Sequence, residues 1–195
     1  MSDADRFERA IAGIDAANAD DPNTIEARGA VRPKELAHAE LMTEWVGRLA
    51  PQASEAQLLA ARAHHLRRWT SPRASYPAGR SGYLRWRTAL KAQHADEVAE
   101  ILTTAGYDTD TIETVQRILK KQGLGTDPQV QVHEDALCLV FLETQLAATT
   151  DQLGDEHMLD VIRKTVAKMS PAGLAEVAAI PMRDHDRDLI AEALA

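Results

Sequence analysis

The chain has little of what disulfide-stabilised, membrane-spanning and nucleotide-loop proteins require. One cysteine, Cys138, among 195 residues excludes an internal disulfide and fits a reducing compartment. No apolar run approaches the roughly 20 residues that span a bilayer, and the start MSDADRFERA lacks the basic and apolar segments of a signal peptide. We therefore expect a cytoplasmic protein with no membrane partner. The GxGxxG, GxxxxGK(S/T) and CxxC patterns are also absent, which removes the common dinucleotide, P-loop and paired-thiol chemistries.

Aromatic residues are scarce as well, at 4% of the chain, whereas 45% of the residues are hydrophobic and many of these are alanine or leucine. That composition favours helix over sheet. The formal net charge of -8 argues against a general nucleic-acid or membrane-surface binder. The length is that of one domain with a good core.

Apolar residues recur at helical spacing along most of the chain, and Pro, Gly and Ser stand at the ends of the periodic segments. The pattern predicts an all-α, single-domain helical bundle of about seven to nine helices over residues 1–195. We expect no sheet of more than two short strands, and loops at 19–33 and 70–82. The expected helices are 3–18, 33–50, 54–69, 83–105, 109–121, 128–148, 156–169, 171–181 and 184–194. A polar site would be built from about 34–148, with the helices of 154–195 packed on it.

Several histidines and carboxylates lie on or beside the apolar stripes of these helices. They are His38, His64, His65, His94, Glu134 and Asp135. Burying such groups is expensive unless they have partners, and a distributed set of them is typical of a metal or acid/base centre. The helix of 128–148 is apolar nearly all round, so periodicity does not choose between the two acids; we prefer Asp135.

Taken singly, some of these histidines favour simpler interpretations. His38 alone would be a hydrogen-bonded core residue, and His94 alone, beside Asp96 and Glu97, a surface residue. We expect His133, His157 and His185 to be solvated. Only the ordered set favours a divalent metal such as zinc, manganese or iron, because these ions accept imidazole and carboxylate ligands from separate elements.

Four segments carry a resemblance to a known family: HAELMTEWVGRLA from His38, LLAARAHHLRRW around His64 and His65, HADEVAEIL from His94, and HEDALCLVFLE around Asp135. Their order resembles the HD-domain superfamily of metal-dependent phosphohydrolases, which implies an HD-domain-like helical bundle. The chain is also similar, over nearly its full length, to an uncharacterised family of bacteria and fungi, which implies no established activity.

The HD resemblance implies roles for individual residues. His38 corresponds to the first metal-binding His, His64 to the His of the His-Asp pair, and Asp135 to the terminal Asp. His94 corresponds to the additional His of two-metal members. His65 stands where the family has its aspartate, and an imidazole cannot bridge two metals as a carboxylate does. His65 and His94 are then candidate proton carriers or further ligands.

A basic stretch is the second informative feature. Residues 56–95 hold eight basic residues and no Asp or Glu. They are Arg62, Arg67, Arg68, Arg73, Arg80, Arg85, Arg87 and Lys91. These side chains would either pair with acidic helices or form an anion-binding wall beside His64. In the second case Arg67, Arg68, Arg85, Arg87 and Lys91 bind the substrate, Arg68 also assists catalysis, and Trp86 offers a stacking face.

The leading hypothesis is a metal-dependent hydrolase for a small phosphorylated or nucleotide-like substrate, so the expected partner is a small anionic ligand rather than nucleic acid. Two alternatives stay open. One is an HD-type iron oxygenase, and the other is a non-catalytic helical domain with a structural metal or a polar core.

Overall fold

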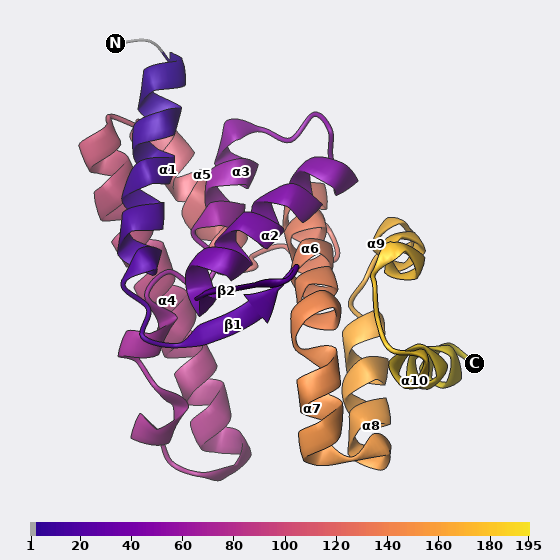
Figure 1. The fold of residues 1–195 in the computed structure, drawn as a ribbon. Helices are drawn as coiled ribbons and strands as arrows, with labels where there is room; N and C mark the ends of the chain where they lie inside the picture. Colours follow the sequence, from indigo (N-terminus) through magenta and orange to yellow (C-terminus); the bar gives the residue numbers. More distant parts are fainter. Residues whose placement is uncertain (1–2) are drawn as a thin grey trace.

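The computed structural model describes residues 3–195, and this part of the chain is all-helical apart from one small hairpin (Figure 1). Ten α-helices are present in it. They are α1 (Asp3–Ala19), α2 (Lys34–Leu49), α3 (Glu55–Arg62), α4 (Gly79–Ala105), α5 (Thr109–Leu119), α6 (Pro128–Thr144), α7 (Leu146–Leu153), α8 (Asp155–Val166), α9 (Pro171–Glu176) and α10 (Asp184–Leu194). Short 3-10 turns lie at Arg68–Thr70, Arg73–Ser75 and Val177–Ala179. The predicted fold class is therefore confirmed.

Local signals explain most helix boundaries. Ser54 begins α3 with a reciprocal capping box to Gln57, and Gly106 ends α4 in a left-handed conformation with φ 96°. Pro128 and Pro171 occupy the first turns of α6 and α9, where a missing N–H costs nothing. The single helix expected over 128–148 is divided at Gln145 into α6 and α7. The described chain therefore has ten α-helices where nine were expected.

The segment 19–33 is not only a loop. Strands β1 (Thr24–Ala27) and β2 (Ala30–Pro33) pair antiparallel, with Ala27 opposite Ala30. The two turn residues, Arg28 and Gly29, both have positive φ, at 51° and 79°, which is the geometry of a tight hairpin turn. The hairpin runs directly into α2 and so positions its first turn.

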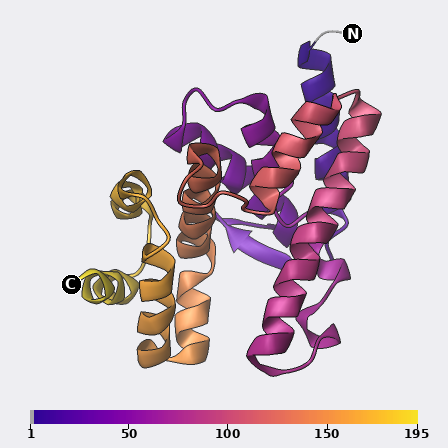
Figure 2. The same ribbon diagram turned by 180° about the vertical axis from the view of Figure 1, so that it is seen from behind.

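Two hydrophobic clusters form the core, and they meet along α6. One is built from α1, α3, α4 and α5 around residues such as Leu59, Leu102 and Ile118. The other joins α2 and α6 to the C-terminal helices around residues such as Met42 and Leu139. Figures 1 and 2 show α8–α10 on the opposite side of α6 from α1, α4 and α5. Side chains from α2, α3, α4 and α6 can therefore meet between the clusters. Within residues 3–195 no helix combines the length and the apolar character needed to cross a membrane.

Candidate functional site

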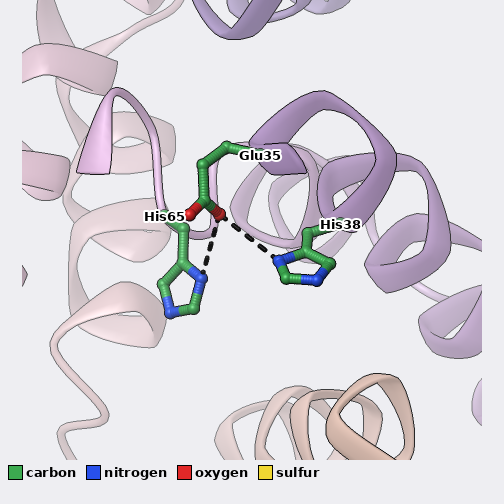
Figure 3. Close-up of side chains that lie close together, drawn as sticks. All are labelled: Glu35, His38 and His65. Atoms are coloured by element: carbon green, nitrogen blue, oxygen red, sulfur yellow. Dashed lines mark ion pairs between the residues drawn. The ribbon is translucent and has the colours of Figure 1, made fainter. Parts of the chain in front are cut away.

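A carboxylate and two imidazoles converge where α2 faces the turn that follows α3. One oxygen of Glu35, Oε2, lies 3.4 Å from Nδ1 of His38 and 3.3 Å from Nδ1 of His65. Figure 3 shows this oxygen between the two rings. The side chains of Glu35 and His38 are 5% and 3% exposed, and that of His65 is 13% exposed. All three offer a potential metal-ligand atom within 4.8 Å of the others.

Local structure fixes this arrangement. Glu35 and His38 are three residues apart on α2, so they share one face of the helix. The backbone N–H of Glu35 donates to Oδ2 of the buried Asp21, which holds the start of the helix. His65 lies beyond the end of α3, because that helix stops at Arg62 rather than at about Trp69 as expected. Its φ of 65° is left-handed, a conformation that costs a non-glycine residue about 1–3 kcal/mol and is concentrated at functional sites.

The hydrogen bonds of His38 leave one of its ring nitrogens facing Glu35. Thr144 donates its hydroxyl to the carbonyl of Val140, so its oxygen must accept from His38 Nε2, 3.3 Å away. Nδ1 of His38 then faces Glu35 Oε2. This contact is an ion pair when Nδ1 carries a proton, and Nδ1 offers a lone pair to a metal ion when it carries none. Glu35 Oε2 has no hydrogen-bond partner within residues 3–195.

The guanidinium of Arg68 covers the face of His65. One of its nitrogens lies 3.2 Å from Nδ1 and 3.1 Å from Nε2 of the ring. A nitrogen equally close to both ring nitrogens cannot lie in the ring plane without colliding with Cε1 between them. Arg68 therefore packs above the ring and leaves the in-plane lone pair of His65 unused.

Three further histidines lie next to this centre. His64 Nδ1 and His133 Nε2 are 3.0 Å apart and share one proton, and the His64 ring lies 4.1 Å from that of His65 between centroids. His94, on α4, donates from Nδ1 to the carbonyl of Leu66 at 2.8 Å, so its Nε2 is the basic nitrogen. His64 Nε2, His94 Nε2 and His133 Nδ1 are buried and have no partner within residues 3–195.

Burial keeps these histidines neutral. It lowers the pKa of His94 to about 4, against the opposing hydrogen bond to Leu66, and lowers the pKa of His133 to about 3. Burial, followed by the neighbouring charges of His65 and His133, holds the pKa of His64 well below its ordinary value. For His65, burial and then the cation of Arg68 have the same effect on the pKa. Neutral imidazoles are the form that binds metals and accepts protons.

A small cavity of about 20 Å³ opens beside the histidines, with room for one water-sized group. Its lining includes four cations and no carboxylate. The lining residues are His64, His65, Arg68, Arg87, Leu90, Lys91, His94, Leu119 and Lys121. Lys121 is ion-paired to the buried Glu134, whereas Arg87 and Lys91 form no ion pair with any part of the chain that the structure describes. A cavity of this size and charge is suited to one oxygen of an anion that lies at its border with the neighbouring cleft, where Arg68, Arg87 and Lys121 line both.

The structure brings together most of the residues expected from the sequence. His38, His64, His65 and His94 lie in one group, and Arg68, Arg87 and Lys91 line the adjoining cavity. Asp135 is placed elsewhere: its carboxylate accepts from the backbone N–H of Ser170 at 2.8 Å, from the Ser170 hydroxyl at 2.5 Å, and from Gln131 at 3.0 Å.

The other predicted substrate-binding residues lie outside the cavity. Arg67 is exposed and lines a separate groove between α1 and α4. Arg85 is exposed on α4. Trp86 is buried, its Nε1 donates to the carbonyl of Ser71 at 2.8 Å, and the Arg68 guanidinium lies 5.1 Å above its ring. The aromatic face of Trp86 is thus used to position Arg68.

One expectation about polar residues needs correction. His133, expected to be solvated, is 1% exposed, because α6 lies between both core clusters and has no free face around that residue. Of the two alternatives for the basic stretch, ion pairing applies in the described chain to Arg62 alone, which pairs with Asp15 and Glu40. His157 and His185 are exposed as predicted.

Glu35 was not among the candidates chosen from the sequence. The available signal was its position three residues before His38, which puts its carboxylate on the same inward face. A first-turn glutamate is usually a favourable partner of the helix dipole, so its burial is visible only in three dimensions.

These features define an all-helical protein with a buried histidine–carboxylate centre beside a basic cavity. The model of a family described as a domain of unknown function (DUF4202) matches residues 8–190, and the chain belongs to this family. Comparisons with curated proteins and with solved structures gave no match.

The neutral state of His133 has a consequence for stability. Its pKa is about 3 in the folded protein and near 6.5 when unfolded, so between these values the unfolded state binds more protons. His133 should therefore lower the free energy of unfolding by about 1.4 kcal/mol for each pH unit as the pH drops from about 6 to 4. Denaturant titrations of metal-free protein at several pH values would measure the slope.

His133→Gln should reduce that slope, since the amide does not titrate and its nitrogen can replace Nε2 beside His64. His157→Gln, at an exposed position, is the matched control and should leave the slope unchanged. An identical slope in wild type and His133→Gln would contradict the buried, neutral assignment.

Proposed function

We propose that the protein is a metal-dependent hydrolase acting on a small phosphorylated substrate, with a divalent cation held by Glu35, His38 and His65. The observation that carries the proposal is the position of Glu35 Oε2, 3.4 Å and 3.3 Å from two imidazole nitrogens without a hydrogen bond to connect them. Ligand atoms about 2.0–2.1 Å from a tetrahedral ion are separated by about 3.3–3.4 Å. Both pairs that include Glu35 have this spacing, and all three groups offer ligand atoms within 4.8 Å of one another.

The donor types fit a catalytic ion. Two imidazoles and one carboxylate are used by hydrolytic zinc sites, which keep a further position for water or substrate. A divalent cation here would act as a Lewis acid and lower the pKa of a coordinated water. This arrangement keeps the HD-type chemistry that the sequence resembles, but Glu35 takes the carboxylate role that the resemblance assigns to Asp135, and His65 becomes a ligand.

The surrounding residues would bind the anion and move protons. Arg68 and Arg87 can each donate paired N–H groups to phosphoryl oxygens, and their charge opposes the charge that develops there. His94 has its lone pair on Nε2 and lines the cavity, so it is the candidate proton acceptor. A divalent cation at Glu35 would add positive charge beside the cavity, so binding of an anion and of the metal should reinforce each other.

One observation favours a second candidate. A 2-His-1-carboxylate set with open positions is also the ligand set of non-haem iron oxygenases. Elemental analysis of the purified protein distinguishes the two proposals, together with turnover of phenyl phosphate. Zinc or manganese with phosphate release supports the hydrolase, iron with oxygen consumption supports the oxygenase, and a metal without either activity supports a structural centre.

Arg68→Met is expected to raise the KM for a phosphorylated substrate, or the Kd for phosphate, roughly 10-fold or more. Each charge-assisted hydrogen bond to an anion contributes about 1.5–3 kcal/mol. Metal content should not change, because Arg68 packs on the face of His65 and leaves the ligand atoms free.

The neighbouring Arg67 provides the control. It is exposed and lines a different groove, so Arg67→Met should leave phosphate binding within about twofold of wild type. Equal losses in the two variants would mean that the basic stretch acts through its general field and not through this cavity.

A further inference from the structure

A larger cleft, of about 320 Å³, adjoins the basic cavity. On one side are Tyr83 and Arg87 of α4, and on the other are residues of α6 and α8. The cleft shares His65, Arg68, Arg87 and Lys121 with the cavity, so the two are continuous. Its volume lies within the usual range for small-molecule sites.

The chemistry of the lining residues changes from the cavity to the cleft. The residues shared with the cavity are polar and mostly cationic, whereas five of the nine that line only the cleft are apolar or aromatic. These five are Tyr83, Leu137, Cys138, Phe141 and Val161, and the other four are Glu134, Gln145, Thr165 and Lys168. Tyr83 and Phe141 approach from different walls, although the whole chain has only 4% aromatic residues. A ligand that fits both parts has a small anionic end and a flat body with apolar faces and a polar edge.

The cavity itself has no room for an organic group, because its volume is only about 20 Å³. Its inner wall is formed by His64, Leu90, His94 and Leu119, all between 3% and 6% exposed. An anion placed against Arg68, Arg87 and Lys121 could therefore carry one organic arm, directed into the cleft, but not two.

We propose that this cleft binds the organic part of a phosphomonoester, and that this part is an aromatic ring held between Tyr83 and Phe141. The proposal rests on the proposed function for the chemistry of the anion, and it adds the substrate class. Aromatic rings gain from offset or edge-to-face stacking beyond the area that they bury. The side-chain amide of Gln145, on the same cleft, would select rings that carry a hydrogen-bonding edge.

Binding can be measured by calorimetry with phosphonates, sulfonates and phosphinates, which are not hydrolysed. Phenylphosphonate should bind at least about 10-fold more tightly than methylphosphonate, which has the same anionic end. Benzenesulfonate and diphenylphosphinate carry equal charge but one and two organic arms, and diphenylphosphinate should bind at least about 10-fold more weakly. No preference for the phenyl group, or equal binding of the two-armed anion, would overturn the proposal.

Variants of the two aromatic residues test whether the phenyl group binds between them. Phe141→Leu and Tyr83→Ala should each remove most of the preference for phenylphosphonate and leave methylphosphonate binding within about twofold; Tyr83 is 45% exposed, so its replacement does not threaten folding. Arg80→Met, exposed on the same helix as Tyr83, should change neither affinity. If the preference survives both aromatic substitutions, the ring binds elsewhere and the proposal is wrong.

Turnover separates this inference from the hydrolase proposal. Selective binding of phenylphosphonate without hydrolysis of phenyl phosphate would support the ligand class and refute the hydrolase. Hydrolysis of phenyl and glycerol phosphates at equal kcat/KM, with no preference in binding, would support the hydrolase and refute the aromatic ligand class.

Discussion

Glu35→Gln is expected to lower the affinity of the protein for a divalent cation by about 100-fold or more. Replacing a residue that only supports a metal ligand already lowers metal affinity 10–100-fold, and Glu35 itself supplies the carboxylate of the centre formed with His38 and His65. The amide keeps the shape of the side chain but removes the charge that faces His38 and His65. Elemental analysis after gel filtration, and equilibrium dialysis against zinc and manganese, would measure the loss.

Glu44→Gln is the matched control, because Glu44 lies on the same helix but is exposed and paired with Arg28. It should retain wild-type metal content. Metal should also raise the Tm of the wild type and of the control but not that of Glu35→Gln, since a ligand stabilises only a state that binds it. Full metal content in Glu35→Gln would refute the proposed centre.

Asp135→Ala is expected to lower the free energy of unfolding by about 2–4 kcal/mol without reducing metal content. The carboxylate is 2% exposed and accepts three hydrogen bonds, two of them from Ser170 at the start of α9. Losing bonds to a charged acceptor costs about 1.5–3 kcal/mol each, and it leaves buried donors unpaired. The Asp135 side chain also packs on Gly173, so its removal opens a void under α9.

Urea unfolding would measure this change, with Asp160→Ala as the control. Asp160 pairs with Lys164 on the surface of α8, and both side chains are more than 60% exposed, so its loss should cost less than about 1 kcal/mol. The experiment also tests the ligand role that the HD resemblance implies for Asp135. Loss of metal from Asp135→Ala at unchanged stability would restore that role and contradict the structural one.

The helices were predictable because their determinants are local. Periodic apolar residues define each inward face, and Ser54, Gly106, Pro128 and Pro171 define ends within a few residues of those observed. The segment 24–33 was expected to be a loop because its strands are only four residues each, too short for an alternating pattern to be distinctive. The end of α3 was misplaced because Asn18 Oδ1 accepts the backbone N–H of Arg67, a contact from α1 that stabilises a turn where the sequence favours helix.

Most histidines of the candidate site were predictable as a set, but Glu35 and the pairs that the residues form were not. The spacing of His38 and the order of the HD-like segments grouped His38, His64, His65 and His94, and the acid-free stretch indicated a basic wall. The sequence did not show that His64 pairs with His133, or that Glu35 and not Asp135 faces His38.

The sequence by itself determined the helical class, most helix boundaries and the types of polar groups that are buried, because these depend on neighbours within about one turn of the chain. Tertiary structure alone decided which of those groups meet. Asp135 and His133 stand two residues apart on α6, yet one supports α9 and the other pairs with His64. That choice depends on how the two hydrophobic clusters set the helices against each other, over contacts far apart in the chain. The helical period determines the direction in which a side chain points, but not which residue it meets there.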